Sequence, residues 1–165
     1  MRILGIDPGY AIVGWGVIDK DNRFNCQVVD YGAIITTKDQ TFPERLEIIG
    51  KAMNKLIDEF KPDALAIEEL FFNQNTTTAI AVAEARGVIL YVCKQKNLDM
   101  YEYTPLQIKQ ALTGNGRAEK KQVQYMTKIM LKLKDVPKPD DTADAIAVAL
   151  THAQTNGMMT SNRIK

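Results

Sequence analysis

The chain has 165 residues and a mass of 18.5 kDa, which favours one domain with one hydrophobic core. Its 45% hydrophobic residues come in runs too short for a transmembrane helix, and Asp7 brings a charge too early for a signal peptide, so we expect a cytoplasmic protein without membrane contact. Two distant cysteines, Cys26 and Cys93, exclude a disulfide framework, and the net charge of +1 argues against a nonspecific polycation.

The first forty residues have the pattern of β-strands. An apolar run over 3–6 ends at the turn-forming sequence Asp7-Pro8-Gly9, and two stretches rich in β-branched residues follow at 13–18 and 28–37. Because the connections between these stretches are short, the pattern predicts an antiparallel meander of three strands.

A helix is predicted next. Thr41 and Glu44 have the spacing of a capping box, and the apolar residues after them recur every three or four positions. Ala64–Ile67 then has the composition of a strand that is buried on both faces, and the acidic pair Glu68-Glu69 follows it directly.

The second half of the chain is predicted to be mostly helical. After a polar loop over 71–78, helices are expected over 79–96, from Pro105 to Gly114, over 118–133 and from Asp140, with a strand over 99–103 after the first of them. This order of elements predicts a mixed sheet flanked by helices, in one α/β domain over residues 1–155. Residues 156–165 are expected to form a flexible C-terminal tail.

Acidic residues stand where three of the predicted elements begin or end. Asp7 follows the first strand, Glu68 follows the strand over 64–67, and Asp141 and Asp144 share one face of the last helix. If the two strands are parallel neighbours, their carboxyl ends bring Asp7 and Glu68 together. The residues alone also allow a turn residue at Asp7, a solvated strand end at Glu68 and helix caps at the other two.

Clustered carboxylates favour a metal site. Two of them about 4 Å apart repel by roughly 4 kcal/mol at an effective dielectric constant of about 20. A hard divalent cation bound through oxygen removes this cost, and two such ions can activate water and stabilise the leaving oxygen in phosphodiester hydrolysis. The acidic pattern therefore predicts metal-dependent cleavage of a phosphate backbone.

Two further features suit a nucleic-acid ligand. Residues 94–134 hold nine basic and three acidic side chains, a local charge of +6 that leaves −5 for the rest of the chain. This asymmetry fits an anionic ligand near acidic chemistry, although lysines on amphipathic helices also simply face water. Phe71 and Phe72 stand near Glu68 in a polar loop, where they either pack into the core or unstack bases.

Five motifs, in order along the chain, resemble the bacterial RuvC-type Holliday junction resolvases, which are crossover junction endodeoxyribonucleases. The motifs are Ile3-Leu4-Gly5-Ile6-Asp7-Pro8-Gly9, Ala66-Ile67-Glu68, Ala85-Arg86-Gly87, Ala118-Glu119-Lys120 and Asp141-Thr142-Ala143-Asp144-Ala145. The resemblance covers residues 1–155 and implies an RNase H-like fold, with a mixed five-stranded sheet flanked by helices. It also implies a homodimer that resolves four-way DNA junctions by paired symmetric nicks in recombination and repair, with a junction branch-migration helicase complex as a partner.

The same resemblance implies the roles of individual residues. The catalytic and metal-binding residues would be Asp7, Glu68, Asp141 and Asp144, which hold two Mg²⁺ ions per active site, with Mn²⁺ as a substitute. The DNA-binding residues would be Phe71, Arg86, Lys109, Lys120 and Lys121, of which Phe71 disrupts base pairs near the crossover. The small residues of the helix over 79–96 offer a candidate dimer interface, and no nucleotide cofactor is expected.

Two other classes of protein stand as alternatives. Nucleotide-binding phosphotransferases of the actin and sugar-kinase type share this fold and a strand-turn similar to Gly5–Gly9, but they need two such domains where 165 residues hold one. A noncatalytic DNA-structure binder would use the basic region over 94–134 alone. ATP turnover would identify the first class, and junction binding without metal-dependent cuts the second.

Overall fold

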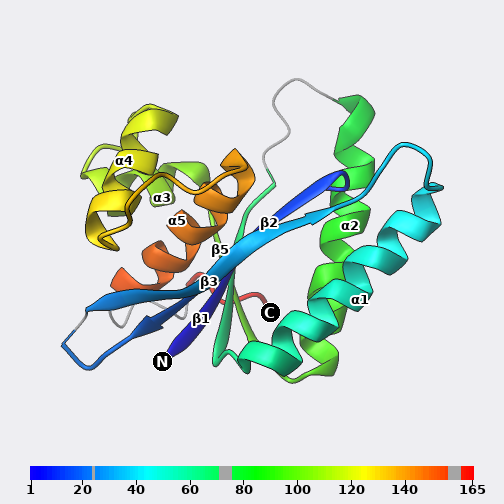
Figure 1. Ribbon diagram of the computed structural model, residues 1–165, viewed down its shortest axis with the longest axis horizontal. Helices are drawn as coiled ribbons and strands as arrows, with labels where there is room; N and C mark the ends of the chain where they lie inside the picture. The colour runs from blue at the N-terminus through cyan, green and yellow to red at the C-terminus, as the bar shows by residue number, and fades with distance from the viewer. Residues whose placement is uncertain (24, 71–75, 156–160) are drawn as a thin grey trace.

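The computed structural model describes residues 1–23, 25–70, 76–155 and 161–165, and Figure 1 shows a central sheet with helices on both faces. The strands are β1 (Arg2–Asp7), β2 (Ile12–Lys20), β3 (Cys26–Ile35), β4 (Ala64–Glu68) and β5 (Asp99–Tyr103). The helices are α1 (Phe42–Phe60), α2 (Thr76–Gln95), α3 (Pro105–Thr113), α4 (Lys120–Met130) and α5 (Asp140–Gln154). None of the helices in these ranges is long and apolar enough to cross a membrane. The predicted α/β class and the predicted order of elements are confirmed.

The five strands form one mixed sheet in the order β3-β2-β1-β4-β5. The first three strands are antiparallel, and β4 is parallel to both β1 and β5. Ile6 of β1 pairs with Ile67 of β4, so the next residues, Asp7 and Glu68, stand side by side at the carboxyl ends of the two strands. The parallel pairing on which the predicted acidic site depended is therefore present.

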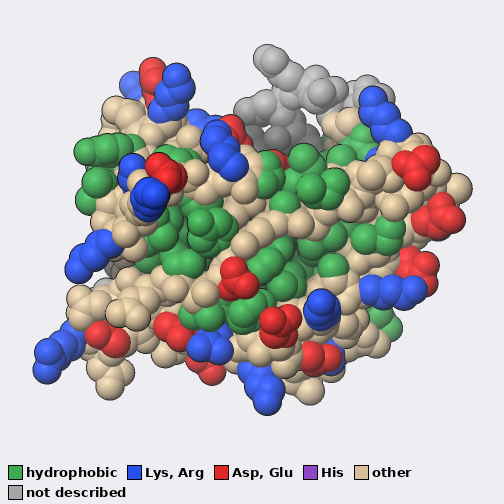
Figure 2. Space-filling model, in the orientation of Figure 1, with side chains coloured by type: hydrophobic (Ala, Val, Ile, Leu, Met, Phe, Trp, Pro, Cys, Tyr) green, Lys and Arg blue, Asp and Glu red, His purple; other side chains and the backbone are tan. Residues whose placement is uncertain are grey.

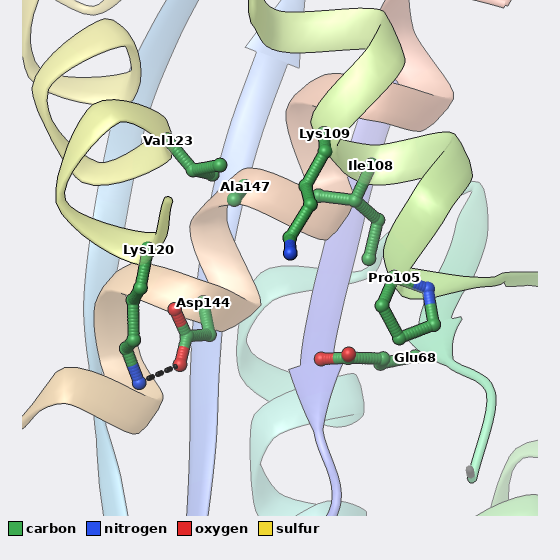
Figure 3. A pocket seen from close by; sticks show the side chains of 8 residues that line it. All are labelled: Glu68, Pro105, Ile108, Lys109, Lys120, Val123, Asp144 and Ala147. Atoms are coloured by element: carbon green, nitrogen blue, oxygen red, sulfur yellow. Dashed lines mark hydrogen bonds and ion pairs between the residues drawn. The ribbon is translucent and has the colours of Figure 1, made fainter. Parts of the chain in front are cut away.

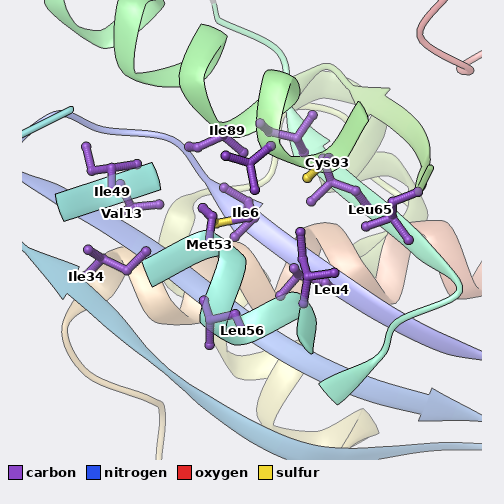
Figure 4. Close-up of a cluster of buried hydrophobic side chains, with 14 of the residues drawn as sticks. Leu4, Ile6, Val13, Ile34, Ile49, Met53, Leu56, Leu65, Ile89 and Cys93 are labelled. Carbon is purple, nitrogen blue, oxygen red and sulfur yellow. The ribbon is translucent and has the colours of Figure 1, made fainter. Parts of the chain in front are cut away.

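The sheet separates two hydrophobic layers. On one face Leu4, Ile6 and Leu65 pack against α1 and α2, as Figure 4 shows. The other face carries α5, with α3 and α4 outside it (Figure 1). Because successive side chains of a strand point to opposite faces, Asp7 and Glu68 both project toward α5.

Glycines allow α5 to lie very close to the sheet. A Cβ atom added to Gly14 would lie 2.0 Å from the carbonyl oxygen of Asp141, and one added to Gly5 would lie 2.1 Å from that of Ala145. Gly14 pairs with Asp7 in the β1–β2 ladder. The close approach therefore brings the start of α5, with its acidic residues, over the end of β1.

We expect Gly14→Ala to lower the free energy of unfolding by about 1–3 kcal/mol or more, because the new methyl group must displace the backbone of α5. The matched control is Gly87→Ala on α2, where an added Cβ meets nothing within 4 Å. That change should raise stability by about 0.5–1 kcal/mol through helix propensity. Urea titration of both variants measures the difference, and equal stabilities would show that α5 tolerates the methyl group.

Three predicted helix boundaries are wrong by a few residues, one of them because the helix expected to reach residue 133 ends at Met130. The helix expected over 118–133 begins only at Lys120, because Glu119 serves as its N-cap and its backbone N–H donates to Oε1 of Gln122 at 2.8 Å. The helix expected from 79 begins at Thr76, inside the loop predicted over 71–78. Threonine has a low intrinsic helix propensity, and this weak preference is overridden by the long alanine-rich helix that follows.

Part of the predicted C-terminal tail lies along the sheet. The backbone N–H of Ile164 donates to the carbonyl oxygen of Met100 at 2.9 Å, and the carbonyl oxygen of Asn162 accepts from the N–H of Glu102 at 2.9 Å. β5 is an edge strand, so its outer backbone groups are open to such pairing. Residues 161–164 are therefore held against β5.

Candidate active site

A pocket of about 250 Å³ opens between β4, α3, α4 and α5, at the carboxyl end of β4 (Figure 3). It is lined by Glu68, Pro105, Ile108, Lys109, Lys120, Val123, Asp144 and Ala147. Apolar side chains form its wall, while two carboxylates and two ammonium groups face the hollow. This combination offers oxygen ligands and positive charge within one small space.

Each charged side chain of the pocket comes from a different element. Glu68 is the last residue of β4, and Asp144 lies in the second turn of α5. Lys109 points from α3 into the hollow, and Lys120 is the first residue of α4 (Figure 3). The Nζ of Lys120 donates to Oδ2 of Asp144 at 2.6 Å and lies 4.0 Å from Oδ2 of Asp140.

Burial and neighbouring negative charge raise the pKa of three carboxylates of the site. Burial, and then the negative charges of Glu68, Asp144 and Asp141, raise the pKa of Asp7 to about 8. Burial and the charge of Asp144 raise the pKa of Glu68 to about 7, although two nearby lysines act in the opposite direction. Burial also raises the pKa of Asp144, against the hydrogen bond from Lys120. The four predicted acids therefore form one electrostatic cluster.

The neighbouring acids have other contacts. The Nζ of Lys138 donates to Oδ1 of Asp140 at 2.5 Å, and this hydrogen bond lowers the pKa of Asp140. The backbone N–H of Glu69 donates to the carbonyl oxygen of Tyr103 at 2.9 Å, which continues the parallel pairing of β4 with β5. Like Asp7 and Asp141, Asp140 and Glu69 do not line the pocket. Unlike Asp141, neither of them is among the charges that raise the pKa of Asp7.

The predicted DNA-binding residues are divided between two faces. Lys109 and Lys120 line the pocket, and Lys121 is exposed beside them on α4. Arg86 lies on α2, against the other face of the sheet, where its guanidinium donates to Oε2 of Glu102 at 2.6 Å. Phe71 lies outside the described residues.

The apolar wall of the pocket is not predicted by the sequence patterns. It consists of Pro105, Ile108, Val123 and Ala147. Helical periodicity was the available signal, and it shows which face of a helix is apolar. It does not show whether that face covers a closed core or borders a hollow.

The donor set suits a hard divalent cation. Among the residues with a described placement, no three His, Cys, Asp or Glu side chains are arranged to hold a metal ion by themselves. Mg²⁺ needs only one or two carboxylates from a protein, since water and phosphate oxygens complete its coordination. The mutual repulsion that helps to raise the pKa of Asp7 is the cost that a bound cation would remove.

Asp7 should make the metal-free protein less stable as the pH rises. Its folded pKa of about 8 lies above the ordinary value of 3.8, so between these values the folded state binds more protons than the unfolded state. Stability therefore falls as pH increases through this range. We expect Asp7→Asn to reduce the decline in Tm between about pH 5 and about pH 8, measured by thermal unfolding in a chelator. An equal decline in Tm in the two proteins would contradict the raised pKa of Asp7.

Comparison with known proteins gives one consistent match. The family model described as crossover junction endodeoxyribonuclease RuvC matches residues 3–152. The chain is 57% identical over 152 residues to the crossover junction endodeoxyribonuclease RuvC of Finegoldia magna, covering 92% of each chain. It is 54% identical over 154 residues to that of Brevibacillus brevis, covering 93% of this chain and 92% of the relative.

Solved structures agree with these matches. The structure of T. thermophilus RuvC in complex with a Holliday junction substrate superposes with a TM-score of 0.93 and 34% identity, covering 99% of both chains. A fowlpox virus resolvase bound to Holliday junction DNA shares the fold, with a TM-score of 0.58 at 14% identity, over 93% of this chain and 97% of that one. The predicted RNase H-like resolvase fold is confirmed.

Proposed function

Because this chain belongs to the crossover junction endodeoxyribonuclease RuvC family, we propose that it resolves four-way (Holliday) DNA junctions by paired symmetric nicks, in homologous recombination and repair. The observation that carries the proposal is the pocket in which Glu68 and Asp144 face Lys109 and Lys120. Carboxylates suit a metal ion and lysines suit a phosphate, so the pocket matches the hydrolysis of a phosphodiester bond. The junction bound to the T. thermophilus relative supports the choice of substrate.

We infer that Asp7, Glu68, Asp141 and Asp144 hold Mg²⁺, with two ions per active site and Mn²⁺ as a substitute. Bound divalent ions supply Lewis acidity toward the phosphate and lower the pKa of water. The residues of the chain position the DNA around them. Lys109 lines the pocket and is placed to bind an oxygen of the phosphate that is cut. Lys120 can bind the same phosphate after its hydrogen bond to Asp144 is released.

The DNA is proposed to cross the side of the molecule formed by α3 and α4. Figure 2 shows Lys and Arg side chains projecting from this side. Lys121 extends the positive charge of the pocket along α4, whereas Arg86 could meet DNA only after releasing Glu102. We assign Phe71, three residues after Glu68 in the chain, to the disruption of base pairs near the crossover.

A homodimer is the assembly we propose, because a four-way junction has near-twofold symmetry and two matching cuts need two equivalent sites. The outer face of α2 offers a contact surface, since Ile80 is 71% exposed and Tyr91 63% exposed. At Gly87, between them, an added Cβ meets nothing within 4 Å. Ala85, one of the small residues of this helix, is buried in the core instead. Family likeness alone supports a branch-migration helicase complex as a partner and the lack of a nucleotide cofactor.

Incubation with a synthetic four-way junction, with and without Mg²⁺, tests the proposed function on a denaturing gel. We expect cuts at symmetric positions in two strands only when Mg²⁺ is present, and two protein chains per junction by sedimentation. Junction binding without metal-dependent cuts would instead support a noncatalytic DNA-structure binder. ATP turnover by the protein would support a phosphotransferase.

A further inference from the structure

The segment over 161–164 connects the edge of the sheet to the helix that carries Lys109. Its backbone pairs with β5, where Tyr101 and Arg163 form an antiparallel bridge. Arg163 forms an ion pair with Asp99, and Ile164 packs against the core beneath α1 and α2. The segment is therefore anchored independently of α3.

The side chain of Asn162 reaches from this segment to α3. The Nε2 of Gln107 donates to Oδ1 of Asn162 at 3.2 Å. The backbone carbonyl oxygen of Asn162 accepts from the N–H of Glu102 in β5 at 2.9 Å. Asn162 thus links β5 and the first turn of α3.

Gln107 is the residue that closes the N-terminus of α3. Its Oε1 accepts from the backbone N–H of Thr104 at 2.8 Å, and its own N–H donates to Oγ1 of Thr104 at 3.1 Å. Because Asn162 holds the other end of the same amide, it fixes the orientation of this capping box. Lys109 follows two residues later and points into the pocket (Figure 3).

α3 depends on such anchors for its orientation. It has nine residues, and an isolated helix shorter than about 12 residues is marginal in water. Two of its side chains, Ile108 and Leu112, are buried, while Leu106 is 63% exposed. A misplacement of about 1 Å in a group that positions a substrate can cost a hundredfold in rate.

We propose that Asn162 is a positioning residue, which holds the first turn of α3 through Gln107 and so sets where Lys109 enters the pocket. This inference rests on the proposed nuclease function. Asn162 touches neither the DNA nor the metal in this role, and it acts only through Lys109.

Two variants remove the contact in different ways. Asn162→Ala deletes the acceptor, whereas Gln107→Glu deletes the donor but keeps the oxygen that caps Thr104. We expect each variant to slow single-turnover cleavage of a four-way junction about tenfold with junction binding nearly unchanged, and the double variant to be no slower than either. Asn162→Asp keeps an acceptor oxygen and should restore the rate.

A Lys109→Ala background tests whether Asn162 affects the cleavage rate through the position of Lys109. In a Lys109→Ala background, Asn162→Ala should cause no further loss of rate. A tenfold loss in that background as well, or wild-type cleavage by both Asn162→Ala and Gln107→Glu, would overturn the inference. Lys165→Ala is the control, because Lys165 is an exposed residue at the end of the same segment, plays no part in these contacts, and its variant should cleave normally.

Hydrogen exchange separates this inference from the proposed function. The amides of Gln107 and Ile108 should exchange faster in Asn162→Ala than in the wild-type protein, and at the normal rate in Asn162→Asp. Unchanged exchange in Asn162→Ala would overturn the inference even if the protein cuts junctions. A wild-type protein that cuts no junction, with exchange changed as expected, would overturn the proposed function instead.

Discussion

Asp7→Asn is expected to abolish junction cleavage, by about a thousandfold or more, and to leave junction binding intact or stronger. Asparagine keeps the size of the side chain but removes the charge that a divalent cation needs, and the stabilisation such an ion gives the transition state is worth several kcal/mol. Removal of one buried carboxylate also eases the approach of a phosphate, because Glu68, Asp144 and Asp141 already concentrate negative charge there. Single-turnover cleavage and a binding titration measure the two effects separately.

Glu69→Gln is the matched control for this experiment. Glu69 follows Glu68 in the chain but is not among the carboxylates whose charges raise the pKa of Asp7, so its variant should keep substantial activity. Cleavage at the wild-type rate by Asp7→Asn would refute the assignment of Asp7 to the metal site. Equal losses in Asp7→Asn and Glu69→Gln would show that the effect follows from the charge of this region as a whole.

Lys120→Ala is expected to slow cleavage by about a hundredfold and to flatten the dependence of binding on salt. A lysine that stabilises charge on a transferring phosphate contributes about as much as one oxyanion-hole donor. The contact also releases counterions, so its loss should change the slope of log K against log salt by about 0.9. Lys109→Ala should alter the slope to the same extent, because both side chains line the pocket.

Lys51→Ala serves as the control for the salt dependence. Lys51 is an exposed lysine on α1, on the other face of the sheet, and it pairs with Glu47 at 2.6 Å. Its removal changes the net charge by the same amount as the removal of Lys120, but its variant should keep the wild-type slope. Salt slopes that fall equally in both variants would indicate that overall charge, and not the pocket, governs binding.

Several features of the fold could be predicted because their causes lie close together in the chain. The spacing of Thr41 and Glu44 predicts the start of α1, and the N–H of Thr41 does donate to Oε2 of Glu44 at 2.6 Å. The apolar run over 64–67 predicts a strand, and β4 occupies it. The acidic residues at the ends of these elements could be named as candidates for the same reason.

The face of the sheet on which Arg86 lies could not be predicted from the sequence. A motif can show that an arginine stands on a helix, but the face of the sheet that the helix covers depends on strand order and on the crossover connections. In the folded chain Arg86 is 18% exposed and paired with Glu102, on the face opposite Lys109 and Lys120. Its proposed contact with DNA stays a prediction, as do the metal-binding roles of the four acids.

The sequence by itself determined the elements, their order, the acids at their ends and the family resemblance, because hydrophobic periodicity, capping boxes and motifs act over a few neighbouring residues. Only the tertiary structure decided the pocket. The pocket lies where the end of β4 meets α3, α4 and α5. Beside it, the parallel pairing of β1 with β4 aligns Asp7 with Glu68, and Gly14 lets α5 approach the sheet. The pairing of Lys120 with Asp144, 24 positions apart, and that of Gln107 with Asn162, 55 positions apart, likewise depend on how distant segments pack. Such contacts arise from the packing of whole elements, which no local pattern encodes.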